Sequence, residues 1–219
     1  MNISYEDLKK KHRKIRDNLS LDTQLRIHRS LSWLKAADSN NNPDEKFIFL
    51  WISFNAIYGE EHGERYSFNE KDFFKKFIGQ LIRLDKDNLI HTLAWSNYAN
   101  KIRLFVENKY AFQPYWSFVN GRLTDAEWQR KFNNSRKNAY DALAKKDSTV
   151  FCNILFERLY VIRNQLIHGG ATWKGALNRS QVTSGTRILE KFIPAIIHLV
   201  IENAEENWGS TYYKPIETN

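Results

Sequence analysis

The sequence predicts an all-α protein that forms one domain. Helix start signals recur along most of the 219 residues, apolar residues recur with helical spacing, and strand-like alternation is absent. Apolar residues make up 42% of the chain and aromatic residues 14%, which is enough for a substantial core. No stretch rich in proline, glycine or serine divides the chain. We therefore expect a multi-helix bundle over residues 1–219.

Most of the expected helices begin at a recognisable capping signal. Capping boxes, in which a serine or threonine precedes a glutamate by three residues, occur at Ser67 and Thr124. Asn42 and Pro43 supply an N-cap and a proline at the first helical position. In chain order, we expect helices over about residues 4–17, 20–38, 46–58, 67–84, 88–108, 124–144, 148–168 and 184–207.

Several segments have features that predict their place in the fold. The helix over 46–58 is apolar on every side, so it should form the buried centre of the bundle. Residues 109–121 should form an irregular packed connection, and Pro194 should kink the last helix, which Gly209 ends. We expect an N-terminal extension of two helices over about 4–38, a core bundle over about 43–208 and a frayed tail over 210–219.

Composition narrows the classes of partner and compartment. The formal net charge of +8 favours polyanionic partners, with nucleic acid ahead of an anionic membrane. Cys152 is the only cysteine, which excludes an intramolecular disulfide and fits a reducing compartment. Its neighbours Phe151 and Ile154 indicate a small buried hydrophobe. The N-terminus has no apolar signal segment, and the run from Phe47 to Phe54 is too short to span a bilayer. We expect a soluble cytoplasmic protein without membrane contact.

Arg163, Asn164 and His168 carry the most chemical content in the chain. They lie near the end of the helix expected over 148–168, and two glycines come directly after them. An imidazole can move a proton near pH 7, and a guanidinium can bind a phosphate through a planar fork of donors. Together these groups could cleave RNA without a metal. The simpler alternative is that the segment only caps a helix.

Helical spacing sorts this helix into two faces, at about 100° per residue. The apolar face carries Phe151, Leu155, Leu159, Ile162 and Leu166, and the polar face carries Asn153, Glu157, Tyr160, Asn164 and His168. Large hydrophobic residues border the polar face, so we expect another part of the chain or a second copy to cover it. Arg163 and His168 diverge by about 140°, and cleavage needs two proton-transfer groups. A twofold dimer would bring both motifs into one cleft.

At these residues the chain resembles the HEPN superfamily (higher eukaryotes and prokaryotes nucleotide-binding domain). Its ribonuclease members carry an Arg-x4–6-His motif, often with a polar residue directly after the arginine. Arg163, Asn164 and His168 match this motif at its shortest spacing. The segment Trp51-Ile-Ser-Phe-Asn55-Ala-Ile-Tyr58-Gly59 is also similar to the larger stand-alone and Apea-like HEPN proteins. The resemblance covers roughly Pro43 to the final helix.

The resemblance implies a helical bundle, a homodimer with a composite active site at its interface, and a metal-independent endoribonuclease that needs no cofactor. Such enzymes leave a 2′,3′-cyclic phosphate and a 5′-hydroxyl, and commonly act in phage defence or as toxins. Arg163 would stabilise the phosphorane, His168 would transfer a proton, and Asn164 would orient the substrate or the histidine. The alternative is a non-catalytic HEPN module that binds a nucleotide or a partner protein.

An antitoxin or regulatory protein is a further partner that the resemblance implies. HEPN toxins that pair with a minimal nucleotidyltransferase antitoxin usually carry a tyrosine shortly after the histidine. Here Gly169, Gly170 and Ala171 occupy these positions instead. This departure argues against that particular antitoxin.

Asn55, Tyr58 and Tyr160 are further candidates for substrate binding. Asn55 lies one turn from Trp51 on the apolar helix, and a buried asparagine needs hydrogen-bond partners. A structural role in the core and a place in the cleft are therefore about equally expected for Asn55. The loop Glu60-Glu61-His62-Gly63-Glu64 holds metal-binding residue types, but no second cluster accompanies it, so we expect no metal site.

Basic and aromatic residues elsewhere offer candidate RNA contacts. The basic run in the first expected helix, which includes Lys10, Lys11 and Arg13, could contact an RNA backbone or form a solvated helix face. The same two alternatives apply to Arg130, Lys131, Arg136 and Lys137. Trp116 and Trp173 could stack on bases or belong to the core.

Overall fold

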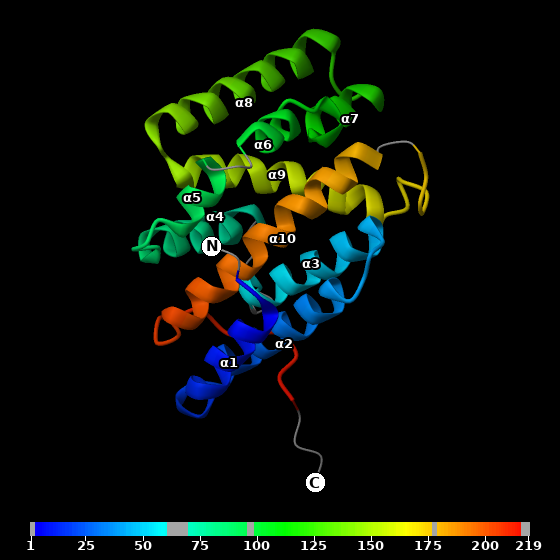
Figure 1. Cartoon of the computed structure of the whole chain (residues 1–219). Coiled ribbons are helices and arrows are strands. Elements are labelled where there is room, and N and C mark those ends of the chain that lie inside the picture. Colours follow the sequence, from blue (N-terminus) through cyan, green and yellow to red (C-terminus); the bar gives the residue numbers. More distant parts are fainter. Residues whose placement is uncertain (1–2, 61–69, 96–98, 177–178, 216–219) are drawn as a thin grey trace.

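The computed structural model describes residues 3–60, 70–95, 99–176 and 179–215, and all the secondary structure in these ranges is helical. This confirms the predicted all-α class for the described chain (Figure 1). The helices are α1 (Tyr5–Ile15), η1 (Arg16–Asn18), α2 (Leu21–Asp38), α3 (Pro43–Tyr58), α4 (Glu70–Leu84), α5 (Leu89–Trp95), α6 (Ala99–Val106), η2 (Lys109–Ala111), α7 (Gln113–Val119), α8 (Asp125–Lys145), α9 (Ser148–Ile167) and α10 (Arg179–Glu202).

The capping signals place the helix starts correctly. Ser4 and Ser20 accept backbone N–H groups of the first turns of α1 and α2, each at 3.2 Å. At α8 the box is reciprocal, because Glu127 N–H donates to Thr124 Oγ1 at 3.3 Å and Thr124 N–H donates to Glu127 Oε2 at 2.7 Å. Ser67, the other expected capping box, lies outside the described residues. Local side-chain chemistry therefore defines these helix starts.

Helix α3 is central, as its apolar composition predicts, and it packs chiefly against α2 and α10. Small residues allow close approach. Ser30 of α2 and Ser53 of α3 are fully buried, and each hydroxyl donates to the other's carbonyl oxygen, at 2.9 and 2.8 Å. On the other side, a Cβ at Gly185 of α10 would lie 2.9 Å from Phe47 Cε2. Both N-terminal helices contribute to the same core, through residues such as Leu8 and Ile27.

Two predicted segments differ from the structure. Residues 88–108 form two helices, α5 and α6, with residues 96–98 outside the described chain. The expected irregular connection over 109–121 is wrong, because it contains η2 and α7. Pro114 lies in the first turn of α7, where a missing N–H costs no helical hydrogen bond.

The last helix also differs in its limits. Helix α10 begins at Arg179 rather than near Ser184, and it ends at Glu202, before Gly209. Pro194 lies inside it, and most of its side chains from Ile188 onward are buried. Among the described residues, no helix combines the length and the apolar character needed to cross a bilayer.

The chain after α10 is held against α2, in contrast to the predicted frayed tail. Asp22 accepts the N–H of Thr211 at 2.7 Å and the Nζ of Lys214 at 2.9 Å. Arg29 donates to the carbonyl oxygens of Tyr212 and Tyr213, at 2.6 and 2.5 Å. The tail as far as Lys214 is thus part of the fold, and residues 216–219 lie outside the described chain.

Candidate functional site

Helix α9 positions the Arg163–His168 motif. Asp147 caps it by accepting the N–H of Val150 at 3.0 Å. The predicted apolar stripe is confirmed: Phe151, Leu155, Leu159 and Ile162 are fully buried, and Leu166 packs against the core. The motif therefore lies at the end of a helix that its opposite face fixes firmly in the bundle.

Arg163 and Asn164 form a direct side-chain pair. Arg163 Nη1 donates to Asn164 Oδ1 at 3.0 Å, and the guanidinium carbon lies 5.6 Å from the centre of the Tyr160 ring. Neighbouring residues on a helix do not normally face each other. The hydrogen bond therefore draws the arginine around the helix, towards the face that carries Asn164 and, one turn later, His168. This reduces the divergence between Arg163 and His168 that ideal helical spacing predicts.

His168 is the C-cap residue of α9 and its side chain is exposed. Its backbone N–H donates to the carbonyl oxygen of Asn164 at 3.0 Å. Gly169 then adopts a φ of +69°, a left-handed conformation that favours glycine, and the chain leaves the helix. The two glycines thus end the helix as predicted and leave the imidazole accessible to a substrate or to a second copy.

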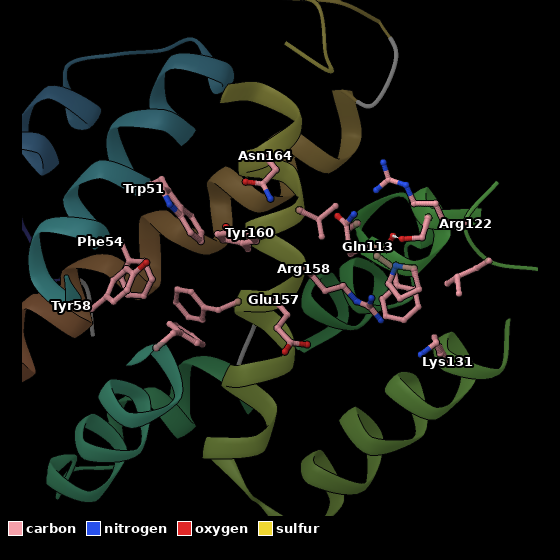
Figure 2. Close-up of a pocket in the computed structure, with 18 residues that line it drawn as sticks. Trp51, Phe54, Tyr58, Gln113, Arg122, Lys131, Glu157, Arg158, Tyr160 and Asn164 are labelled. Carbon is pink, nitrogen blue, oxygen red and sulfur yellow. Dashed lines mark hydrogen bonds between the residues drawn. The ribbon is translucent and has the colours of Figure 1, made fainter. Parts of the chain in front are cut away.

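A hollow of about 590 Å³ adjoins the motif (Figure 2). It is bounded by α3, α4, η2, α7, α8 and α9. The residues that line it are Trp51, Phe54, Tyr58, Phe74, Ala111, Phe112, Gln113, Pro114, Ser117, Arg122, Leu123, Lys131, Phe156, Glu157, Arg158, Tyr160, Val161 and Asn164. Three members of the polar face of α9 are among them, so the chain itself covers part of that face and leaves a cavity beneath the cover.

One end of the hollow is aromatic. The Trp51 ring centre lies 5.6 Å from that of Phe54 and 6.1 Å from that of Tyr160, and Phe54 lies 4.8 Å from Phe156. Trp51 is only 4% exposed, and its Nε1 has no hydrogen-bond partner among the described residues. A buried indole N–H normally finds a partner. Although the Trp51 ring lines the hollow, its Nε1 atom is itself buried and is not exposed to the cavity.

The other end of the hollow is cationic. Arg158 is 2% exposed, its Nη2 donates to Ser135 Oγ at 3.0 Å, and its guanidinium lies 4.1 Å from the centre of the Phe112 ring. Burial lowers the pKa of Arg158 to about 10. Arg122 and Lys131 lie on the same side in Figure 2, and both are exposed.

The predicted binding residues separate into two groups. Tyr58, Tyr160 and Asn164 line the hollow, whereas Asn55 does not, although its Oδ1 is buried without a partner in the described chain. Lys10, Lys11 and Arg13 belong to α1, which lies at the opposite end of the molecule from α7 and α8 (Figure 1). Lys11 is bound by Glu202 at 2.5 Å. The structure does not bring these basic residues to the motif.

The remaining candidates have mixed locations. Lys131 lines the hollow, whereas Arg136 is paired with Glu107 at 3.1 Å. Trp116 Nε1 donates to the carbonyl oxygen of Tyr110 at 2.8 Å, and Trp173 is 65% exposed. Neither tryptophan lines the hollow.

Arg158 was not singled out from the sequence, although a signal was present. It falls on the apolar stripe of α9, three residues after Leu155 and four before Ile162. A charged residue on a core-facing stripe is unusual and indicates a special environment. Arg122 gave no comparable signal, because it lies in the connection between α7 and α8 and reaches the hollow only through the fold.

Other reactive groups are less informative. Cys152 is buried, as predicted, and burial, followed by the charge of Asp85, raises the pKa of its thiol to about 12. In the described ranges no three histidine, cysteine, aspartate or glutamate side chains are grouped so as to hold a metal ion. The loop over 61–64 lies outside those ranges.

Comparisons with models of protein families, with curated proteins and with solved structures found no match to this chain. The resemblance to the HEPN superfamily therefore stays a prediction from the motif residues. A functional assignment depends on the geometry around Arg163, Asn164 and His168.

Proposed function

We propose that this protein is a HEPN-type endoribonuclease that cleaves RNA without a metal and leaves a 2′,3′-cyclic phosphate and a 5′-hydroxyl. The observation that carries the proposal is the hydrogen bond from Arg163 to Asn164. It turns a phosphate-binding group towards the helix face of His168, an exposed imidazole at the end of the same helix. The proposed place of action is the cytoplasm, in phage defence or as a toxin.

In the proposed reaction the ribose 2′-hydroxyl loses its proton to a base, and its oxygen attacks the neighbouring phosphorus. The bond from phosphorus to the 5′-oxygen breaks, and that oxygen receives a proton from an acid. Arg163 would neutralise the negative charge that develops on the two non-bridging oxygens. His168 would act as one of the two proton-transfer groups.

A homodimer supplies the second proton-transfer group in this proposal. The described residues around the motif offer one histidine, whereas the reaction uses a base and an acid. A twofold axis beside the C-terminal end of α9 would place two copies of His168 at one phosphodiester. Ile167 and Trp173, which are 47% and 65% exposed, lie next to this end of the helix in sequence and would supply apolar contact area.

The direct test is cleavage of single-stranded RNA with excess EDTA by wild-type protein and by the His168→Ala and Arg163→Ala variants. We expect the wild type to release 2′,3′-cyclic phosphate ends and each variant to lose activity by at least about 10³-fold, because each removes a group that acts in the transition state. His28→Ala is the matched control, since it removes an exposed histidine on α2. The control should cleave at the wild-type rate.

Folding and dimerisation are measured alongside cleavage. Circular dichroism and light scattering should give wild-type melting and a dimer mass for His168→Ala. If His168→Ala cleaves at the wild-type rate, or if the wild type is a monomer that cleaves at full rate, the proposed composite mechanism is wrong. Specific binding of a partner protein or nucleotide by a wild-type protein that cleaves no RNA would instead identify a non-catalytic module.

For the cellular role, expression of the wild type should arrest growth and expression of His168→Ala should not. A protein co-purified with the wild type that restores growth would be the antitoxin or regulatory partner. Equal toxicity of the two forms would contradict a role based on RNA cleavage.

A further inference from the structure

We propose that the hollow between α3, α7 and α9 is a nucleotide pocket, which takes one nucleotide of the RNA strand. Its aromatic end would hold the base, and Arg122, Lys131 and Arg158 would bind the phosphate. The ligand class, a flat ring joined to a phosphate, follows from the hollow alone. The assignment of that nucleotide to an RNA substrate rests on the proposed function.

The size and walls of the hollow suit such a ligand. Its volume of about 590 Å³ lies within the range of about 300–1,000 Å³ that is typical of small-molecule sites. Tyr58, Tyr160 and Trp51 supply aromatic surface against which any of the four bases could pack.

The charges favour a ligand with an anionic group. Among the described residues that line the hollow, three are cations, Arg122, Lys131 and Arg158, and one is a carboxylate, Glu157. Within the described chain, the one side-chain hydrogen bond of Arg158 goes to the Ser135 hydroxyl, and its buried Nε has no hydrogen-bond partner. The charge of Glu157 acts on Arg158 without forming a contact ion pair, and a buried cation that lacks a close counter-ion is costly. A bound phosphate would supply that counter-ion, which a purely apolar ligand would not.

The location of the hollow links it to the cleavage motif. Asn164 lines the hollow and accepts the hydrogen bond from Arg163. A nucleotide in the hollow would therefore lie against the residue that positions the arginine. The phosphodiester next to this nucleotide in the strand would lie near the end of α9, where His168 is exposed.

The test measures binding by calorimetry to wild-type protein at low salt. The probes are the four nucleoside 5′-monophosphates, the matching nucleosides and inorganic phosphate. We expect every monophosphate to bind, and the nucleosides and inorganic phosphate alone to bind at least about tenfold more weakly, because each fills only one end of the hollow. Equal affinity for nucleoside and monophosphate would overturn the proposal, as would no binding by any monophosphate.

Variants tie the binding to the hollow. Lys131→Gln and Arg122→Gln should each weaken monophosphate binding about fivefold or more, because each removes one contact of a cation with the phosphate. Arg130→Gln is the matched control, since Arg130 is exposed on α8 next to Lys131 but does not line the hollow. An equal effect of the Arg130 and Lys131 variants would indicate attraction by general surface charge and would overturn the proposal.

A further variant tests the aromatic end. Tyr160→Leu replaces a half-buried ring that lines the hollow with an aliphatic side chain, so it should weaken monophosphate binding and leave the binding of inorganic phosphate unchanged. Unchanged monophosphate binding would contradict this placement of the base.

Competition identifies the source of the nucleotide. A single-stranded 2′-O-methyl oligonucleotide has no free 2′-hydroxyl and cannot be cut by the proposed reaction. If this strand displaces the monophosphate, the result supports the claim that the hollow takes one nucleotide of an RNA strand. If the monophosphate stays bound, that claim is overturned and the ligand is a free nucleotide. Cleavage is scored separately with His168→Ala, so a failed pocket and a failed ribonuclease mechanism give different results.

Discussion

Arg163 and Asn164, adjacent in sequence, act as one unit, because Arg163 Nη1 donates to Asn164 Oδ1 at 3.0 Å. The backbone carbonyl oxygen of Asn164 meanwhile accepts the N–H of His168 at 3.0 Å. Asn164 therefore contacts both other members of the motif, one through its side chain and one through its backbone. The sequence alone left open whether Asn164 orients the substrate or the histidine, and the structure adds the arginine as its side-chain partner.

Asn164→Ala should lower the rate of RNA cleavage by about 10- to 100-fold, because a displacement of about 1 Å in the position of a catalytic group costs that much. The loss should fall mainly on kcat. Initial rates on a single-stranded substrate give the result, and circular dichroism verifies the fold. Asn153→Ala is the matched control, as it removes another half-buried asparagine from the same face of α9. Equal rates for Asn164→Ala and wild type would show that Arg163 needs no such support.

The helices were predictable because their signals are local. The hydroxyls of Ser4, Ser20 and Thr124 each accept a backbone N–H of the next helical turn, so a few neighbouring residues determine each start. Helix α7 was missed because Pro114 and a run of aromatic residues suggested a broken segment. In the fold that proline lies in the first turn, and Trp116 and Trp128 pack around Tyr115.

The motif was predictable from residue types at a fixed spacing, whereas the hollow was not. Trp51, Arg122 and Asn164 come from three separate segments, and only the packing of α3, α7 and α9 brings them to one cavity. No local sequence pattern indicates that these three residues lie close together. The exception is Arg158, whose position on an apolar helical stripe could have been noticed in the sequence.

Two buried arginines should respond differently to substitution by methionine. Arg26 is fully buried and donates to the carbonyl oxygens of Ile57, Gly59 and Gly209 at 2.8, 2.8 and 3.2 Å. Its replacement leaves these oxygens without their donors, which should cost about 3 kcal/mol or more. In the described chain, Arg158 donates one side-chain hydrogen bond, to Ser135, and its guanidinium lies against the Phe112 ring. Arg158→Met should change the free energy of unfolding by no more than about 1 kcal/mol, because it also removes a buried charge that has no contact ion pair.

Urea unfolding of the two variants measures this difference. A loss for Arg158→Met as large as that for Arg26→Met would mean that Arg158 has a structural role. If Arg158→Met leaves the free energy of unfolding nearly unchanged and weakens the binding of monophosphates, Arg158 serves the ligand rather than the stability of the fold.

Stability should fall as the pH drops below about 6.5, in part because of His12. This side chain is 5% exposed, and burial lowers its pKa below the ordinary value of 6.5, with further contributions from His28 and Arg16. The unfolded chain binds a proton at His12 from about pH 6.5 downward, whereas the folded chain resists it, so unfolding becomes more favourable in this range. His198, whose pKa is also lowered by burial and then by Lys11, adds to the same trend.

Melting temperatures of wild type and His12→Leu at pH 7.5 and pH 5.5 measure the contribution of His12. The variant should lose less stability between the two pH values than the wild type does. A contribution of about 1 kcal/mol corresponds to about 2–4 °C in Tm for a domain of this size. Identical pH dependence in the two proteins would exclude His12 as a source of the effect.

Two helical glycines should give opposite results when replaced by alanine. Gly79 of α4 has no atom within 4 Å of the site of a new Cβ, so Gly79→Ala should stabilise the fold by up to about 1 kcal/mol through helix propensity. At Gly185 of α10 the new Cβ would lie 2.9 Å from Phe47 Cε2 and 3.2 Å from Leu159 Cδ2. Overpacking costs about 1–3 kcal/mol and exceeds the propensity gain.

Gly185→Ala should therefore lower the free energy of unfolding, since Phe47 and Leu159 are both fully buried and have little room to shift. Urea unfolding of the two variants, side by side with wild type, provides the measurement. Both variants gain helix propensity. Of the two, Gly185 alone lies at a close contact, where α10 meets α3 and α9, so the difference between the variants measures the effect of that contact. If Gly185→Ala is stabilised as much as Gly79→Ala, the helices do not approach each other as closely as the packing at Gly185 requires.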